Sequence, residues 1–223
     1  MSSSLLTLVA LAPAFCLLAP TEAAPGSTTT PTSTPSTPPH IFMIVADDLG
    51  WNDVSWRDRA HIHSPVLERL AGEGVVLNQS YVQPVCSPSR AAFLSGMYPF
   101  HVGLQHDSLR ATQKAFLPGK VKTLADHLKG LGYSTHMAGK WHLGFCNWRY
   151  TPTYRGFDTF VGFYNAVQDY YTHTGHRHGY DFRNNKEVYW AANGTYSANV
   201  LTEHIQRVIA SHDGKTPLFV YLP

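Results

Sequence analysis

The stretch "HIFMIVADD", residues 40–48, is a continuous apolar run that ends in two aspartates, Asp47 and Asp48. Runs of this kind are typical of parallel strands that are buried on both faces. Three further segments are predicted as strands: 75–81, 133–140 and 217–223. Residues that start and stop helices predict helices over 64–74, 86–96, 122–132 and 196–214.

Strands that alternate with helices predict an α/β layer fold, in which helices cover the faces of a mostly parallel sheet. In such sheets, ligands bind beyond the carboxyl ends of the strands. We therefore expect site residues in "DDLG" (47–50), in "GKWHLG" (139–144) and in whatever follows "PLFVYLP" (217–223).

The composition excludes several classes of protein. A chain of 223 residues with 43% hydrophobic residues can bury a core and is not disordered over most of its length. A net charge of +2 predicts no basic face for nucleic acid. Three cysteines are too few for a small disulfide scaffold.

The first 39 residues are expected to lie outside the folded domain. Residues 1–23 hold a short apolar run followed by small residues, which is the pattern of a secretory signal peptide. Residues 24–39 are nearly all Pro, Ser and Thr and predict an extended linker. The folded part is therefore expected over 40–223, and no later segment is apolar enough to span a membrane.

Two N-x-S/T sequons agree with a secretory route. They make Asn78 and Asn193 candidate N-glycosylation sites. The tract "HTGHRHGY" (173–180), with His173, His176 and His178, resembles a metal-binding tract but is expected to be a polar surface loop.

Two strand ends carry polar side chains that can bind a metal ion or an anionic substrate. Asp47 and Asp48 offer hard oxygens for Ca²⁺ or Mg²⁺, although a polar turn after the strand explains them as well. Lys140 and His142 are two apart on extended chain, so both can point to the same side. A fixed ammonium beside an imidazole suits an anionic substrate, and a solvated loop is the alternative.

Cys86 begins the segment "CSPSR", in which Ser87 is a candidate helix N-cap and Pro88 the first helical residue. The start of a helix favours thiolates and anions. Cys86 is thus either a chemical group or one half of a disulfide with Cys146.

"CSPSRAAFLSG" (86–96) resembles the sulfatase signature, which is C-x-P-S-R followed by a small-residue helix and then Ser or Thr before Gly. "GKWHLG" resembles the second sulfatase signature, and "ADDLGWNDV" (46–54) resembles the family's N-terminal metal-binding motif. "GLQH", "GYSTHMAGKWHLG" and "RGFDTFVGF" are most similar to the arylsulfatase B branch, the N-acetylgalactosamine-4-sulfatase relatives. The resemblance covers residues 40–223.

The resemblance implies an alkaline-phosphatase-like α/β fold and a sulfuric ester hydrolase acting on aryl sulfates or on glycosaminoglycan-like sugars. It also implies that Cys86 is oxidised to formylglycine in the endoplasmic reticulum. The formylglycine-generating enzyme reads the motif in the unfolded chain. The mature protein is then expected in the lysosome or outside the cell.

The resemblance also assigns roles by position. Asp47, Asp48 and the modified Cys86 are expected to bind one Ca²⁺. Arg90 would orient the formylglycine, and Lys140 would bridge it and the sulfate ester. His142 would hydrogen-bond the hydrated aldehyde and act as a base.

Several residues of the family pattern are not found before Pro223: a further His, an Asp-Asn pair and a second Lys. The resemblance is therefore to the N-terminal portion of a catalytic domain, and activity of this chain alone is not expected. Two alternatives stay open. One is a catalytically inactive secreted protein that binds sulfated glycans; the other is a formylglycine-dependent phosphodiesterase or phosphonate hydrolase.

Overall fold

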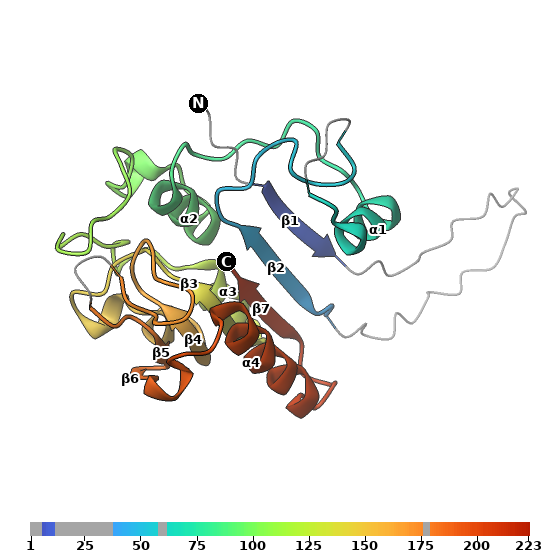
Figure 1. The fold of residues 1–223 in the computed structure, drawn as a ribbon. Helices are drawn as coiled ribbons and strands as arrows, with labels where there is room; N and C mark the ends of the chain where they lie inside the picture. The colour runs from blue at the N-terminus through green and yellow to red at the C-terminus, as the bar shows by residue number, and fades with distance from the viewer. Residues whose placement is uncertain (1–5, 12–37, 58–61, 176–178) are drawn as a thin grey trace, which may run out of the picture.

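The computed structural model describes residues 6–11, 38–57, 62–175 and 179–223, the first of these ranges by its backbone alone. Within these ranges one sheet has the strand order β1-β2-β7-β3-β4-β5-β6 (Figure 1). Its centre is parallel: β2 (Ile41–Ala46), β7 (Leu218–Leu222), β3 (Ser134–Lys140) and β4 (Thr159–Phe163). Antiparallel partners lie at the two edges: β1 (Leu6–Leu11), and β5 (Arg183–Asn184) with β6 (Glu187–Val188). The predicted mostly parallel sheet is confirmed.

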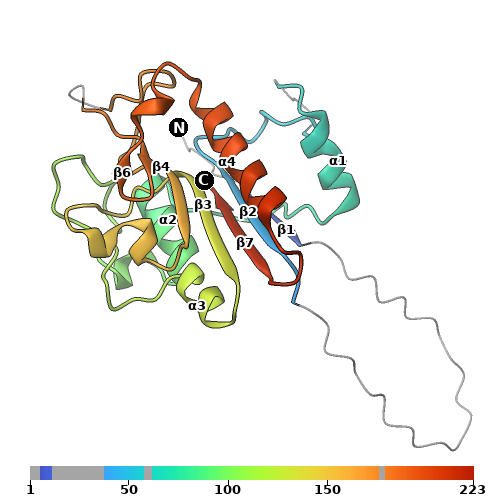
Figure 2. The same cartoon turned by 90° about the horizontal axis from the view of Figure 1, so that it is seen from below.

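Helices cover both faces of this sheet (Figure 2). One face carries α4 (Ser197–Ser211), and the other carries α2 (Cys86–Ser95) and α3 (Leu124–Gly130). The side chains of β7 alternate between the two layers. Phe219 and Tyr221 pack in the core under α2 and α3, whereas Val220 packs against Ile205 of α4. Burial on both faces explains why the strand sequences are continuously apolar.

Most of the predicted helix signals are confirmed, but two at the start of α2 are wrong. Thr123 caps α3 through a capping box with Asp126, and Gly96 ends α2 in the left-handed region. The N-cap of α2 is Val85, so Ser87 is not the cap, and Pro88 is the third helical residue instead of the first. Ser87 lies inside the first turn, where its hydroxyl bonds to other segments. Short 3₁₀ helices cover Pro99–His101, Trp148–Tyr150, Pro152–Tyr154 and Trp190–Ala192.

The segment after "HIHS" differs most from expectation. The predicted helix forms as α1 (Pro65–Glu73), but it has no buried residue. The strand predicted over 75–81 is absent, and Val75 is 85% exposed. A strand needs a neighbour for its backbone N–H and C=O groups, and the described part of the chain offers these residues none.

Strand β1 falls within the predicted signal peptide (1–23), and its pairing with β2 does not test that prediction. Most of the predicted linker, up to residue 37, lies outside the described residues. No helix in the described ranges is long and apolar enough to cross a membrane.

Candidate active site

Three chain segments bring the predicted site residues together. Asp47 follows β2 directly, Lys140 is the last residue of β3, and His142 lies two residues further on. β2 and β3 both pair with β7 in parallel, so their carboxyl ends lie at the same edge of the sheet. Cys86 is the first residue of α2, and Arg90 lies one turn later on the same side of that helix.

An ion cluster joins Asp47, Arg90 and Lys140. Lys140 Nζ donates to Asp47 Oδ2 at 2.7 Å, and Arg90 Nη2 lies 3.4 Å from Asp47 Oδ1. Arg90 Nη1 also donates to the backbone carbonyl of Lys140 at 2.6 Å. The two basic side chains are buried, whereas a third of the carboxylate side chain is accessible (33%). Two cations therefore face one carboxylate, and the excess positive charge suits an anionic substrate.

The cluster keeps Asp47 ionised. Partial burial raises the pKa of this carboxyl, but the charge of Arg90 and the hydrogen bond and charge of Lys140 outweigh it. The pKa of Asp47 consequently lies below its ordinary value of 3.8.

His142 is 2% exposed and takes a left-handed φ of 55° just beyond β3. Its Nε2 lies 2.7 Å from the carbonyl oxygen of Leu109, which can only accept, so Nε2 carries the proton and donates it. Nδ1 then holds a lone pair, and it is buried without a hydrogen-bond partner among the described residues. Burial lowers the pKa of His142 to about 4; the hydrogen bond to Leu109 opposes this, and the charges of Lys140 and Arg90 add to it.

Cys86 contacts the same loop that bonds to His142. Its Sγ is 3.0 Å from the hydroxyl oxygen of Ser108. The hydroxyl of Ser87 donates to the carbonyl of His142 and accepts from the backbone N–H of Leu109, both at 3.0 Å. Sequence reasoning marks Ser87 only as a helix cap and does not mark Ser108, because a loop that crosses a site has no fixed spacing from it.

The structure does not contain the alternative disulfide. Cys86 and Cys146 are both free thiols, and Cys146 is exposed. The glycines of "GKWHLG" allow a close approach between protein segments. A Cβ on Gly139 would clash with the carbonyl of Pro223, and one on Gly144 would clash with Phe116. These glycines bring protein segments close together.

The described residues supply only some of the ligands needed by the calcium site that the resemblance implies. Asp47 and Asp48 are the hard oxygen ligands that Ca²⁺ prefers, and Asp48 is exposed with a left-handed φ of 55°. In the described ranges, however, no group of three or more His, Cys, Asp or Glu side chains is placed to hold a metal ion. Ca²⁺ takes about six to eight oxygens. The residues fit in kind but not in number.

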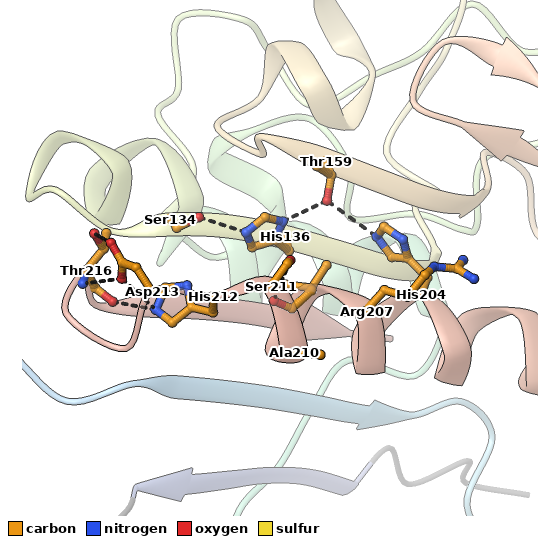
Figure 3. A pocket seen from close by; sticks show the side chains of 11 residues that line it. Ser134, His136, Thr159, His204, Arg207, Ala210, Ser211, His212, Asp213 and Thr216 are labelled. Carbon is orange, nitrogen blue, oxygen red and sulfur yellow. Dashed lines mark hydrogen bonds and ion pairs between the residues drawn. The ribbon is translucent and has the colours of Figure 1, made fainter.

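A second polar region lies between α4, β3 and β4 (Figure 3). It is a groove of about 770 Å³ whose lining includes His136, His204 and His212. His136 bonds to the hydroxyls of Ser134 and Thr159, each at 2.7 Å, and His204 Nε2 lies 3.4 Å from the same Thr159 hydroxyl. These polar atoms bond to one another, and the Thr159–His204 contact links β4 to α4.

The expectation of a polar surface loop is wrong for His173. This ring is fully buried, stacks on Phe182 with centroids 4.3 Å apart, and donates from Nε2 to the carbonyl of Ala192 at 2.9 Å. The aromatic contact and the satisfied N–H explain why it is buried. His176 and His178 lie outside the described residues. Asn78 and Asn193, the candidate glycosylation sites, are both exposed.

Comparisons with known proteins identify the family to which the chain belongs. Residues 39–223 match the profile of the family described as Sulfatase. The chain is 47% identical over 189 residues to arylsulfatase J of Mus musculus, covering 82% of this chain and 31% of that protein. It is 35% identical over 134 residues to N-acetylgalactosamine-6-sulfatase of Sus scrofa, covering 56% of this chain and 25% of that protein.

Solved structures give the same result. The crystal structure of Ps i-CgsB in complex with k-i-k-neocarrahexaose matches with a TM-score of 0.74 and 28% identity, covering 84% of this chain and 44% of that one. The chain thus spans about a third of the length of arylsulfatase J. None of these matches singles out the arylsulfatase B branch. The family profile and the sequence identities show that the chain belongs to the sulfatase family.

Proposed function

We propose that this chain forms the N-terminal part of the catalytic domain of a sulfuric ester hydrolase that uses a formylglycine made from Cys86. The observation that carries the proposal is the contact network at the carboxyl edge of the sheet. It consists of the ion cluster of Asp47, Arg90 and Lys140, and of two hydrogen bonds to one loop, from His142 to Leu109 and between Cys86 and Ser108.

Formylglycine supplies a hydrated aldehyde, which acts as the nucleophile on sulfur and lets the sulfate leave afterwards. The chain's own groups make that chemistry favourable. Lys140 and Arg90 are fixed cations that balance the charge developing on sulfate oxygens. His142 presents a neutral Nδ1 that can take up a proton, because its Nε2–H is already donated to Leu109.

For the substrate we propose a sulfate ester on a sugar of the glycosaminoglycan kind, as in the N-acetylgalactosamine-4-sulfatase branch. This is supported by the sequence motifs and by two of the matches. One is a sulfatase of N-acetylgalactosamine, and the other is a structure with k-i-k-neocarrahexaose bound. We propose the secretory pathway as the route, ending in the lysosome or outside the cell, with Asn78 and Asn193 glycosylated.

The modification of Cys86 is tested by mass analysis of protein secreted from animal cells. Trypsin releases residues 70–90, a peptide that contains both Cys86 and Asn78. After enzymatic removal of glycans, formylglycine appears as replacement of the thiol sulfur by a carbonyl oxygen. Cys146→Ser is the matched control and leaves the peptide unchanged. An intact thiol at position 86 in every preparation would refute the proposed nucleophile.

The reaction is tested with matched aryl sulfate and aryl phosphodiester substrates, using Cys86→Ser as the inactive reference. Faster hydrolysis of the sulfate supports the sulfatase. Faster hydrolysis of the phosphodiester favours the phosphodiesterase alternative. Conversion of Cys86 without turnover of either substrate favours the inactive, glycan-binding alternative.

Calcium is part of the proposal, with Asp47, Asp48 and the side chain at position 86 as its ligands. Because these are few, we expect the described chain to bind Ca²⁺ weakly, with a Kd on the order of 10⁻⁴ M or higher. Titration calorimetry of the parent and of Asp48→Asn measures this. Equal heats for the two proteins would exclude Asp48 as a ligand.

A further inference from the structure

The loop that crosses the start of α2 places a hydroxyl within hydrogen-bond distance of the Cys86 side chain. Ser108 Oγ lies 3.0 Å from Cys86 Sγ, and in the described part of the chain this is the hydrogen bond that the Cys86 side chain makes. Both residues are half-buried, so the contact is partly shielded from water. A hydroxyl can donate one hydrogen bond and accept two, so it can bond to sulfur or to the oxygen that replaces it.

The position of Ser108 is fixed by its neighbour, Leu109. The backbone N–H of Leu109 donates to the hydroxyl of Ser87 at 3.0 Å, and its carbonyl accepts from His142 Nε2 at 2.7 Å. The hydroxyl of Ser87 in turn donates to the carbonyl of His142. Leu109, Ser87 and His142 are all buried. We call this arrangement the Leu109 clamp.

Because the clamp holds both backbone groups of Leu109, the preceding residue cannot drift as a free loop would. The backbone N–H of Ser108 is also bonded, to the carboxylate of Asp107 at 2.7 Å. The hydroxyl is thus held over the first residue of α2 by segments on both sides of the site. Such fixed donors and acceptors are what orients a reacting group.

We propose that Ser108 is a further active-site residue, whose hydroxyl orients the reactive side chain at position 86. The inference rests on the proposed function. A hydrated aldehyde carries two hydroxyls on one carbon, and a hydrogen bond from Ser108 to one of them fixes which hydroxyl remains free for attack. Ser108 also stabilises the hydrate over the free aldehyde, because the hydrate can both donate to its oxygen and accept from it.

The test compares the parent with Ser108→Ala, which removes the hydroxyl, and with Ser108→Thr, which keeps it. Ser211→Ala is the matched control, because in the described ranges the Ser211 hydroxyl bonds within α4, to the carbonyl of Val208, away from the site. Conversion of Cys86 is measured first by peptide mass. It is expected to be equal in all four proteins, because Ser108 lies outside the C-x-P-S-R motif.

Two readouts then separate a role in orientation from a structural one. Labelling of the folded protein by an aminooxy probe, which reacts with the free aldehyde, is expected to be several-fold faster in Ser108→Ala. The kcat for an aryl sulfate is expected to fall about tenfold in this variant, the effect of one neutral hydrogen bond, with KM little changed. Ser108→Thr is expected to restore both values, and Tm is expected to be unchanged.

Equal labelling rates and equal kcat in parent and Ser108→Ala would overturn the role of Ser108 while leaving the proposed function intact. If the parent is converted but inactive, the labelling rate alone decides. An unconverted parent would remove both proposals, and the peptide mass reports that outcome separately.

Discussion

His142 predicts how the stability of the fold changes with pH. Its pKa is about 4 in the folded protein against an ordinary value of 6.5, chiefly because of burial. The unfolded chain therefore binds this proton more readily, and acid favours unfolding. The contribution of His142 is fully present above its ordinary pKa of 6.5 and is lost as the pH falls from 6.5 toward 4. At about 1.4 kcal/mol for each pKa unit, the loss is about 3 kcal/mol.

The perturbation is His142→Gln. Its amide N–H can still donate to the carbonyl of Leu109, but the side chain no longer titrates. Urea unfolding, followed by tryptophan fluorescence, gives the free energy of unfolding at several pH values between about 7.5 and 4. Over this range we expect the parent to lose about 3 kcal/mol more than the variant. His63→Gln, a change of an exposed histidine, is the control and should follow the parent.

Two carboxyls contribute in a lower pH window, and one further histidine contributes in the same window as His142. The pKa values of Asp47 and Asp158 are lowered below 3.8, so their contributions are present above this value and are lost at lower pH. His204, with a pKa of about 4 caused first by burial and then by Arg207, acts in the same window as His142 but is more exposed, so solvent screening reduces its effect. Parallel pH curves for the parent and His142→Gln would refute the reasoning.

Three further outcomes are expected. Thr123→Ala removes the capping box of α3 and should lower the free energy of unfolding by about 1 kcal/mol, measured by urea unfolding, whereas Thr123→Ser should not. Lys140→Met should raise the pKa of Asp47, followed by the carbonyl ¹³C shift in NMR; an unchanged pKa would contradict the ion cluster. Trp190 is 63% exposed and lies three residues before Asn193 in a 3₁₀ turn. Side chains three residues apart in such a turn lie on the same side. A first sugar on Asn193 can therefore stack on the indole of Trp190. Asn193→Gln should therefore lower the Tm of the glycosylated protein by about 2–4 °C, and should have no such effect in a Trp190→Ala background.

The proximity of Asp47 and Lys140 could be predicted from the sequence, because the carboxyl ends of parallel strands lie at one edge of a sheet. Asp47 and Lys140 each end an apolar strand, and strand ends of this kind share one edge. Arg90 follows Cys86 by one helical turn, so their common direction also follows from the sequence. In the structure Asp47, Arg90 and Lys140 form one ion cluster, whereas Cys86 bonds to Ser108.

The partners of these residues could not be predicted in the same way. Ser108 and Leu109 reach the site from a loop more than twenty residues beyond Cys86, and no periodicity fixes where a loop turns back. The strand predicted over 75–81 failed for a related reason. Its apolar residues have the right pattern, but pairing depends on a neighbouring strand that sequence pattern alone does not provide.

The Leu109 clamp links two properties of the site that would otherwise be independent. The carbonyl of Leu109 fixes the tautomer of His142. The backbone position of Leu109 also brings the hydroxyl of Ser108 within hydrogen-bond distance of Cys86. Backbone groups cannot be deleted by mutation, but the hydroxyl of Ser87 can, and it is fully buried. Ser87→Ala leaves the N–H of Leu109 and the carbonyl of His142 without this partner.

Each buried polar group left unpaired costs about 1–3 kcal/mol. Ser87→Ala should therefore destabilise the protein by at least about 2 kcal/mol in urea unfolding. Ser87 occupies the variable position of C-x-P-S-R, so conversion of Cys86 should persist. Ser95→Ala, which removes a half-buried hydroxyl of the same helix, should cost less, since a helical carbonyl loses only its second bond and the N–H that loses its partner belongs to the exposed Met97. If the two variants lose equal stability, the clamp does not hold the site together, and the position of Ser108 must be set by other contacts.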